Sequence, residues 1–207
     1  MQARERFFMG LLSSVVAGGA IWWLQNRSQT YPLYAFIDTE AVAQLAASLP
    51  QDEDEFAWQA WNMVGSQIAY SYYGSILQLV DHSVKCERCV LPQELLTMEN
   101  PKGNCVAKSA LLVSLLRNRF PADRVYMAVG RYAKNGEYPG HAWVETLRQD
   151  GQWYVMESTV PPTRWVPAAE VDDIYLPEAF INDQGSRCAT RKCLIVDPVA
   201  CPCMFAQ

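Results

Sequence analysis

The spacing of apolar and polar positions divides the chain into a helical first part and a β-rich second part. In the first part, helical spacing predicts a short helix that ends at about Ser48 and a longer helix after the acidic run QDEDE at 51–55. In the second part, alternating segments predict three strands, RVYMAVGRY, HAWVETL and QWYVMES, separated by the turns NGEYPG and RQDGQ. Helices followed by an antiparallel meander predict an α+β fold.

A third helix, almost wholly apolar, is expected directly before the strands. Few positions between Asn104 and Arg119 are polar, so this helix should be enclosed on most sides, and Pro121 should end it. Because Cys105 follows a Gly-Asn pair, it falls at the N-terminus of the helix. The preceding link, VKCERCVLPQELLTMENPKG, contains two prolines and is expected to be irregular.

The apolar run FFMGLLSSVVAGGAIWWL at residues 7–24 carries no charge. As a helix it would be roughly 27 Å long, just enough to span a bilayer. Trp22 and Trp23 lie where an interfacial aromatic belt would be. A small-residue face suited to helix pairing, and so to self-association, is formed by Gly10, Ser14 and Gly18. We expect a membrane anchor here; a cleaved signal and a buried helix are the alternatives.

Length and charge limit the organisation and the partners. We expect residues 1–26 to form the N-terminal apolar segment, residues 27–55 a tether with a short helix, and residues 56–207 one domain with a Cys-rich tail. Two arginines precede the apolar run and one follows closely, which favours a membrane-anchored protein with an extracytoplasmic domain. A net charge of -5 without a basic cluster excludes a nucleic-acid partner.

Cys105 is placed as a thiol nucleophile would be. The partial positive charge of a helix N-terminus favours a thiolate, and a nucleophile also needs a base and a group that orients the base. The chain has two histidines: His82 lies in the polar stretch DHSVK and is expected to be solvated, whereas His141 opens a predicted strand. His141 is therefore the candidate base.

The orienting group follows from strand geometry. Glu145 shares a strand face with His141, but four residues at about 3.3 Å each place it roughly 13 Å away. Glu157 ends the next strand, and pairing of residues 141–147 with 151–157 would bring it beside His141. The predicted contact is thus between His141 and the Glu157 carboxylate.

Three segments, GNCVAKSALLVSLLR, GHAWVET and GQWYVMEST, resemble the core motifs of the transglutaminase-like superfamily of papain-type thiol enzymes. The upstream segments AWNMVGSQIAYS and LPQELL are also similar to that family, and the resemblance covers about residues 56–160. It implies a papain-like core, with Cys105 as nucleophile, His141 as general acid/base and Glu157 as the orienting residue. The family usually has Asp at the last position, followed by Pro-Thr, whereas this chain reads Glu-Ser-Thr at 157–159.

The resemblance implies an activity without a required cofactor. Cys105 would attack an amide carbonyl of a protein or peptide and form a thioester. Water would then make the protein a cysteine peptidase or amidase, and an amine would make it a cross-linking acyl transferase; both stay open. The alternative is a noncatalytic, membrane-tethered module that acts as a structural or interaction protein in an assembly.

The other six cysteines form three close pairs. In an exported domain they would form disulfides, and in the cytosol CERC and two tail cysteines would be able to hold a structural zinc ion. Disulfides of undetermined connectivity are the favoured interpretation, and a zinc site and free or mixed thiols are the alternatives. The pairs are Cys86 with Cys89, Cys188 with Cys193, and Cys201 with Cys203.

Overall fold

The computed structural model describes residues 29–72, 76–78, 83–86 and 90–189. Its helices are η1 (Leu33–Phe36), α2 (Ala43–Ser48), α3 (Glu53–Gln67), α4 (Pro92–Thr97), α5 (Cys105–Leu116), η2 (Ala122–Arg124) and η3 (Ala168–Glu170). Its strands are β1 (Gln29–Pro32), β2 (Ala69–Tyr70), β3 (Ile76–Gln78), β4 (Ser83–Cys86), β5 (Lys102–Gly103), β6 (Val125–Tyr132), β7 (Gly140–Leu147), β8 (Trp153–Met156), β9 (Val166–Pro167), β10 (Tyr175–Asn182) and β11 (Gly185–Cys188).

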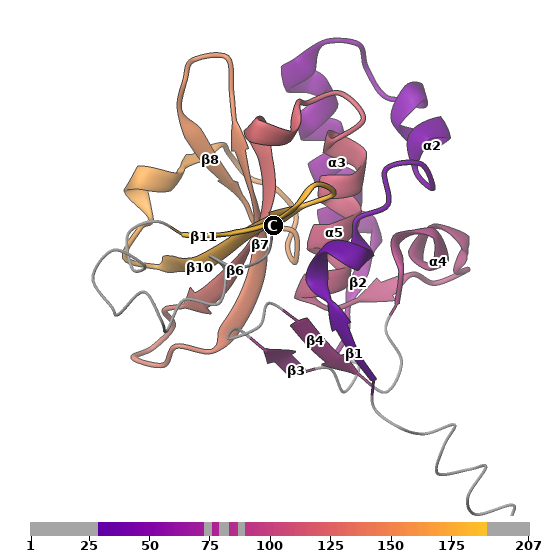
Figure 1. Cartoon of the computed structure of the whole chain (residues 1–207). Coiled ribbons are helices and arrows are strands. Elements are labelled where there is room, and N and C mark those ends of the chain that lie inside the picture. The colour runs from indigo at the N-terminus through magenta and orange to yellow at the C-terminus, as the bar shows by residue number, and fades with distance from the viewer. Residues whose placement is uncertain (1–28, 73–75, 79–82, 87–89, 190–207) are drawn as a thin grey trace, which may run out of the picture.

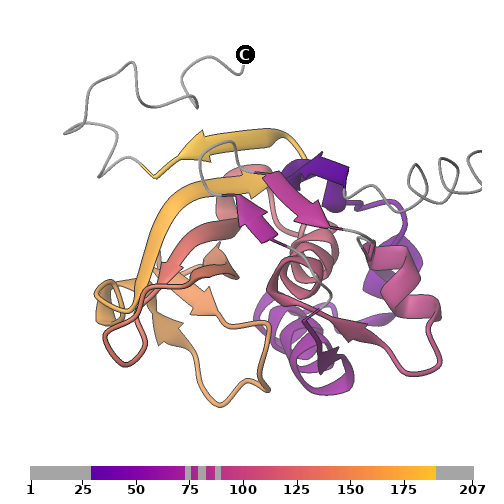
Figure 2. The ribbon, with the colours of Figure 1, turned by 90° about the horizontal axis from the view of Figure 1, so that it is seen from below.

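A six-stranded antiparallel sheet packs against a layer of helices, as Figure 1 shows. The strand order is β11-β10-β6-β7-β8-β9, and α5 lies between the sheet and the other helices. A smaller sheet of order β1-β4-β3 is visible from below in Figure 2. The predicted α+β class, with the cysteine at the start of a buried helix on an antiparallel sheet, is confirmed.

The helix after the acidic run forms as predicted. Asp52 is the N-cap of α3, and its carboxylate accepts hydrogen bonds from the N–H groups of Asp54 and Glu55 at 3.1 and 3.0 Å. The acidic first turn also complements the positive end of the helix. The predicted apolar stripe is buried, and its residues are Ala57, Trp61, Val64 and Ile68. α3 thereby presents one face to α5.

Helix α5 is enclosed along its whole length, because every residue from Val106 to Leu116 is buried. Its polar side chains are satisfied inside the protein: the Ser114 hydroxyl donates to the Ala110 carbonyl at 2.7 Å and accepts from the Asp38 N–H at 3.0 Å. Leu33, Phe36 and Ala46 belong to the same core. The segment predicted as a tether with a short helix therefore contributes buried residues.

The predicted meander is present as β6, β7 and β8. Gly130 pairs with His141 between β6 and β7, and Leu147 pairs with Trp153 between β7 and β8. Gly136 and Gly151 have φ of 82° and 78°, which suits the two turns that join these strands. The meander thus places the start of β7 and the end of β8 at one end of the sheet.

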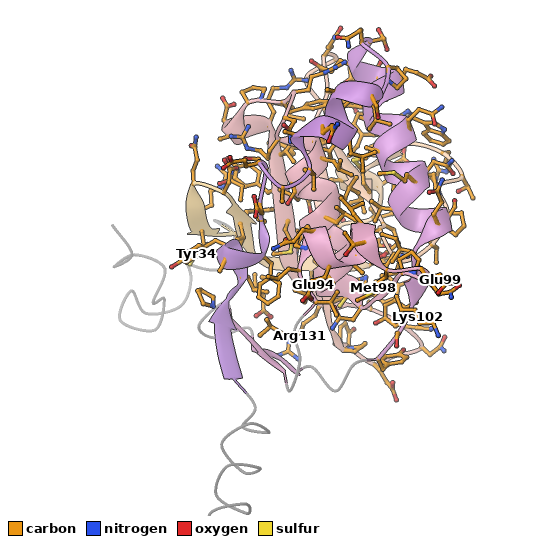
Figure 3. All side chains as sticks on the ribbon, turned by 90° about the vertical axis from the view of Figure 1, so that its right-hand side faces the viewer. Tyr34, Glu94, Met98, Glu99, Lys102 and Arg131 are labelled. Carbon is orange, nitrogen blue, oxygen red and sulfur yellow. The ribbon has the colours of Figure 1, made fainter. Side chains whose placement is uncertain are left out.

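The link before Cys105 differs from expectation. It contains helix α4, which begins with Pro92 and in which the Glu94 side chain accepts from the Leu91 N–H at 3.2 Å. Figure 3 labels Glu94 of this helix and its C-cap residue Met98. The segment YLPEAF lies in β10, between β11 and β6. The β6–β10 register shifts between Pro177 and Ala179, since proline has no N–H for the ladder.

The predicted membrane-anchored location is not supported by the helices that the structure describes. Across the described residues, no helix has the length and apolar character that crossing a bilayer requires. The longest, α3, has 15 residues and an acidic first turn, whereas a span needs about 20 mainly apolar residues. Residues 7–24, with the face predicted for self-association, lie outside the described residues.

Candidate active site

Cys105 is the first residue of α5, and the local sequence explains why the helix begins there. Asn104 is the N-cap, and its side-chain oxygen accepts from the Ala107 N–H at 3.0 Å. Its carbonyl oxygen accepts from the Lys108 N–H at 3.0 Å. The thiol is free and half-buried. The first turn of α5 is therefore fixed by its cap while the sulfur stays partly accessible.

His141 links the nucleophile to a carboxylate. Its Nε2 is hydrogen-bonded to Glu157 Oε2 at 2.8 Å, and the ring also interacts with the Cys105 side chain. Burial lowers the pKa of His141, but the hydrogen bonds and charges of Cys105 and Glu157 outweigh burial and raise it from 6.5 to about 10. The imidazole is thus held protonated at neutral pH and donates to Glu157.

The Glu157 carboxylate is oriented by contacts on both oxygens. Oε1 accepts from the backbone N–H and the hydroxyl of Thr159 at 2.9 and 2.6 Å. Oε2 accepts from the Tyr175 hydroxyl at 3.1 Å in addition to His141. Burial raises the pKa of Glu157, but the hydrogen bond and charge of His141, with the bonds from Thr159, lower it overall. The side chain is therefore an ionised acceptor with a fixed direction.

The segment that carries Glu157 is held by the helix layer. The Trp61 indole N–H of α3 donates to the Glu157 carbonyl oxygen at 2.8 Å. The hydroxyls of Ser109 and Ser158, both buried, share a hydrogen bond of 2.8 Å. The carboxylate that meets His141 of the sheet is thus positioned from α3 and α5.

Aromatic rings surround the histidine. The Tyr132 and Trp143 ring centroids lie 5.5 and 6.1 Å from that of His141, and Trp143 is stacked on it. The Tyr175 ring lies 5.1 Å from Tyr132 and 5.2 Å from Trp143. Burial, followed by the charge and hydrogen bond of Glu157, raises the pKa of Tyr175, so its hydroxyl remains a donor. These rings restrict water access to the His141–Glu157 pair.

The structure brings together the three residues selected from the sequence: Cys105, His141 and Glu157. Glu145 has a different partner, because its carboxylate accepts from the Trp143 indole N–H at 2.9 Å. His82 lies outside the described residues.

Sequence reasoning missed four residues that interact with the site: Trp61 and Tyr175 are hydrogen-bonded to Glu157, the charge of Glu157 acts on Lys108, and Tyr70 interacts with Cys105. A signal existed for two of them, because Trp61 and Tyr70 lie in the upstream segment AWNMVGSQIAYS. Lys108 was also marked in the sequence, because it is a charged residue inside an almost wholly apolar helix. Nothing comparable marked Tyr175.

The described residues contain no group of three or more His, Cys, Asp or Glu side chains that could hold a metal ion. The structure describes the side chains of two cysteines. Cys105 is free, and Cys188 is disulfide-bonded. The predicted disulfides and the alternative zinc site involve cysteines outside the described side chains, so they stay predictions.

Comparison with known families identifies the fold around this site. A family model described as the transglutaminase-like superfamily matches residues 40–158, more than half of the chain. The chain belongs to the transglutaminase-like superfamily. The match includes all three residues of the candidate site and the upstream helix α3. The resemblance noted in the sequence motifs is therefore confirmed.

Solved structures of Legionella pneumophila LapG are similar to this transglutaminase-like chain. The calcium-bound form has 16% identity and a TM-score of 0.45, with 74% of this chain and 88% of that chain covered. A second LapG structure has 14% identity and a TM-score of 0.44, with 76% and 91% covered. No curated protein matches the chain.

The raised pKa of His141 gives a direct test of the Glu157 contact. Replacement of Glu157 with glutamine should lower the pKa of His141 from about 10 towards its ordinary 6.5, because the carboxylate's charge favours the imidazolium. Proton NMR of the imidazole can follow this titration, since the chain has only two histidines. Glu145→Gln is the matched control and should leave the titration unchanged. An unchanged titration in Glu157→Gln would contradict the contact.

Proposed function

We propose that this protein cleaves an amide bond of a protein or peptide, or transfers the acyl group of that bond to an amine, through a thioester on Cys105. The observation that carries the proposal is the position of His141, which is hydrogen-bonded to Glu157 and interacts with the Cys105 side chain at the start of α5. A nucleophile, an acid/base and an orienting carboxylate in contact meet the requirements of thiol catalysis. Membership of the transglutaminase-like superfamily agrees with this chemistry.

In the proposed first half-reaction, the Cys105 thiolate attacks the amide carbonyl carbon and a carbon–sulfur bond forms. The carbonyl electron pair moves to oxygen and then returns, and the carbon–nitrogen bond breaks. His141 gives its proton to the departing nitrogen, which leaves as an amine. The imidazolium form of His141, with its pKa raised to about 10, is the form that can donate this proton.

In the second half-reaction, neutral His141 takes a proton from water or from an amine, which attacks the thioester carbon. The carbon–sulfur bond breaks and the thiolate of Cys105 is restored. Attack by water releases a carboxylic acid, and attack by an amine forms a new amide. Glu157 keeps the ring of His141 in place throughout, because its Oε2 accepts from Nε2.

The proposal is tested with p-nitrophenyl acetate, an activated acyl donor that needs no specific binding site. We expect p-nitrophenolate release with an acetyl thioester on Cys105, located by peptide mass spectrometry and removed by hydroxylamine. Cys105→Ala should lose this adduct and at least about 90% of the rate, since the thiolate is the nucleophile. Glycine methyl ester is added as an amine to identify the acceptor of the acetyl group. Accumulation of N-acetylglycine methyl ester indicates transfer to the amine, and turnover without it indicates hydrolysis.

The comparison reagent is glutathione, a thiol without a helix N-terminus or an acid/base partner. If Cys105 is acetylated no faster than glutathione at the same pH, the enzymatic proposal is wrong and a noncatalytic module remains. If Cys105→Ala releases p-nitrophenolate at the wild-type rate, the reaction occurs at another side chain and Cys105 is not the nucleophile.

A further inference from the structure

A cavity lies on the face of the six-stranded sheet that is turned away from α5. Along β7, Ala142 and Val144 pack in the core that includes α5, so Trp143 and Glu145 point to the opposite face. The cavity has a volume of about 690 Å³ and is lined from β7, β8, β9, β10 and η3. This volume falls within the range of small-molecule sites, about 300 to 1,000 Å³. The three residues of the candidate active site are not among the described residues that line it.

Most of the cavity wall is apolar. Its larger apolar side chains come from β8 and β10 and are Trp153, Val155, Leu176, Pro177 and Phe180. Ala168 and Ala169 of η3 also line the cavity, and their short side chains leave its volume unfilled. The apolar part of a ligand would displace water from these surfaces, which favours binding.

Glu145 supplies a buried carboxylate to this wall. The residue is only 7% exposed, and its Oε1 accepts from the Trp143 indole N–H at 2.9 Å. Burial raises the pKa of Glu145, although the hydrogen bond from Trp143 and the charge of Arg187 act in the opposite direction. A carboxylate has about four acceptor positions on its two oxygens, so Glu145 keeps capacity for a donor inside the cavity.

The charge of the wall is negative. Glu145 and Asp172 are its two carboxylates, and none of the described residues that line the cavity carries a positive charge. Arg187, whose charge acts on Glu145, is exposed and lies over the Tyr126 ring at 4.1 Å, outside the lining. A nearly buried carboxylate is stabilised most by a cation in direct contact, and a ligand can bring one.

We propose that this cavity binds a small amphiphilic amine, whose ammonium group pairs with Glu145 and whose apolar body packs against Trp153 and Phe180. Such a ligand would be separated from the thiol site by Trp143, which is fully buried. The Trp143 ring is stacked on His141, and its N–H donates to Glu145. The inference therefore stands independently of the proposed reaction at Cys105.

The probe is phenethylammonium, and phenethyl alcohol is its neutral counterpart, with a hydroxyl in place of the ammonium group. Both are titrated into the full chain and followed by heteronuclear NMR. The Trp143 indole N–H reports on the cavity, because it is bonded to Glu145. We expect phenethylammonium to shift this resonance in a saturable way, with a Kd at least about tenfold lower than that of the alcohol, since bonds to a charged group are the stronger ones.

Three variants locate the binding. Glu145→Gln keeps an acceptor for the Trp143 N–H but removes the charge, and should raise the Kd of phenethylammonium roughly 10- to 100-fold, while that of the alcohol changes less than about threefold. Ala168→Phe places a ring in the cavity and should weaken both compounds. Glu178→Gln is the matched control: Glu178 lies outside the lining and pairs with Arg131 at 3.1 Å, so both Kd values should stay at the wild-type value.

Several results would overturn the inference. They are the absence of a saturable shift in the wild-type chain, equal Kd values for the amine and the alcohol, and a Kd for phenethylammonium that Glu145→Gln leaves unchanged. Arg191 and Lys192 follow the lining residue Ala189 in the sequence. If phenethylammonium bound only after both were replaced with glutamine, a cation of this chain would be the occupant and the inference would be wrong. Failure of Cys105 to be acetylated would overturn the proposed function alone.

Discussion

Replacing His141 with alanine is expected to slow acetylation of Cys105 by p-nitrophenyl acetate by roughly 10²- to 10⁴-fold, the usual contribution of a positioned acid/base residue. The expectation follows from the contacts of the ring, which joins Cys105 to the Glu157 carboxylate. Without the imidazolium, the thiolate loses its cationic partner. The rate is measured from p-nitrophenolate release at pH 7.5 and from the acetyl adduct on Cys105.

Two controls make the His141→Ala result specific. Added imidazole should restore part of the rate, since it can enter the space that the ring leaves and exchange protons there. His82→Ala removes the other histidine of the chain and should react at the wild-type rate. A full rate in His141→Ala would contradict the proposed pairing, and so would a loss that imidazole does not relieve in a variant with wild-type thermal stability.

The second large effect is a loss of stability when Gly65 is replaced with alanine, although helix propensity alone would predict a gain. Glycine to alanine in a helix interior ordinarily stabilises by about 1 kcal/mol. At Gly65 of α3, however, an added Cβ would lie 2.4 Å from the Val160 carbonyl oxygen and 3.1 Å from the Val160 carbonyl carbon. Because both contacts are with backbone, Gly65→Ala should lower the free energy of unfolding by about 1 to 3 kcal/mol.

Urea denaturation followed by circular dichroism measures the effect at Gly65. The matched control is Ser66→Ala, at the next and exposed position of α3, which should change the free energy of unfolding by no more than about 0.5 kcal/mol. Gly65→Ala should also slow Cys105 acetylation in the folded protein, because Val160 lies three residues after Glu157. A stabilised Gly65→Ala protein would show that the segment at Val160 gives way without strain.

The sequence was sufficient to predict the position of a residue when that position depends on its neighbours along the chain. Cys105 could be placed because a helix start depends on neighbouring residues, and the Asn104 cap is observed. His141 could be placed because alternation over a few residues defines a strand. The first turn of the long helix was predictable from the acidic residues near Asp52 for the same reason.

The partner of His141 was predicted correctly, but the register was not. The observed pairing of Val144 with Met156 places Glu157 opposite Trp143, two residues from His141 along the strand. The Glu157 side chain reaches diagonally across the two strands to His141, and the length of glutamate helps it to do so. Register depends on which residues flank the turn: the predicted pairing set residue 147 opposite 151, whereas Leu147 pairs with Trp153 and the Arg148 N–H bonds to the Gln152 carbonyl oxygen at 3.1 Å.

Contacts between distant segments were beyond sequence reasoning. Tyr70 belongs to a strand of two residues, which is too short to show any periodicity. Tyr175 reaches Glu157 only because β10 lies next to β6, and sequence order places it after β8 and β9. Such pairings depend on the whole sheet, whereas patterns of apolar residues report on one element at a time.

The position of β10 also bears on where this protein can be shortened. The family match ends at residue 158, yet β9, β10 and β11, half of the six-stranded sheet, come later in the chain. A fragment that ended there would retain Cys105, His141 and Glu157 but would expose the edge of β6 and remove the Tyr175 hydroxyl from the carboxylate. The region that the family model matches is thus shorter than the region that forms the sheet and positions the site, which extends at least to β11.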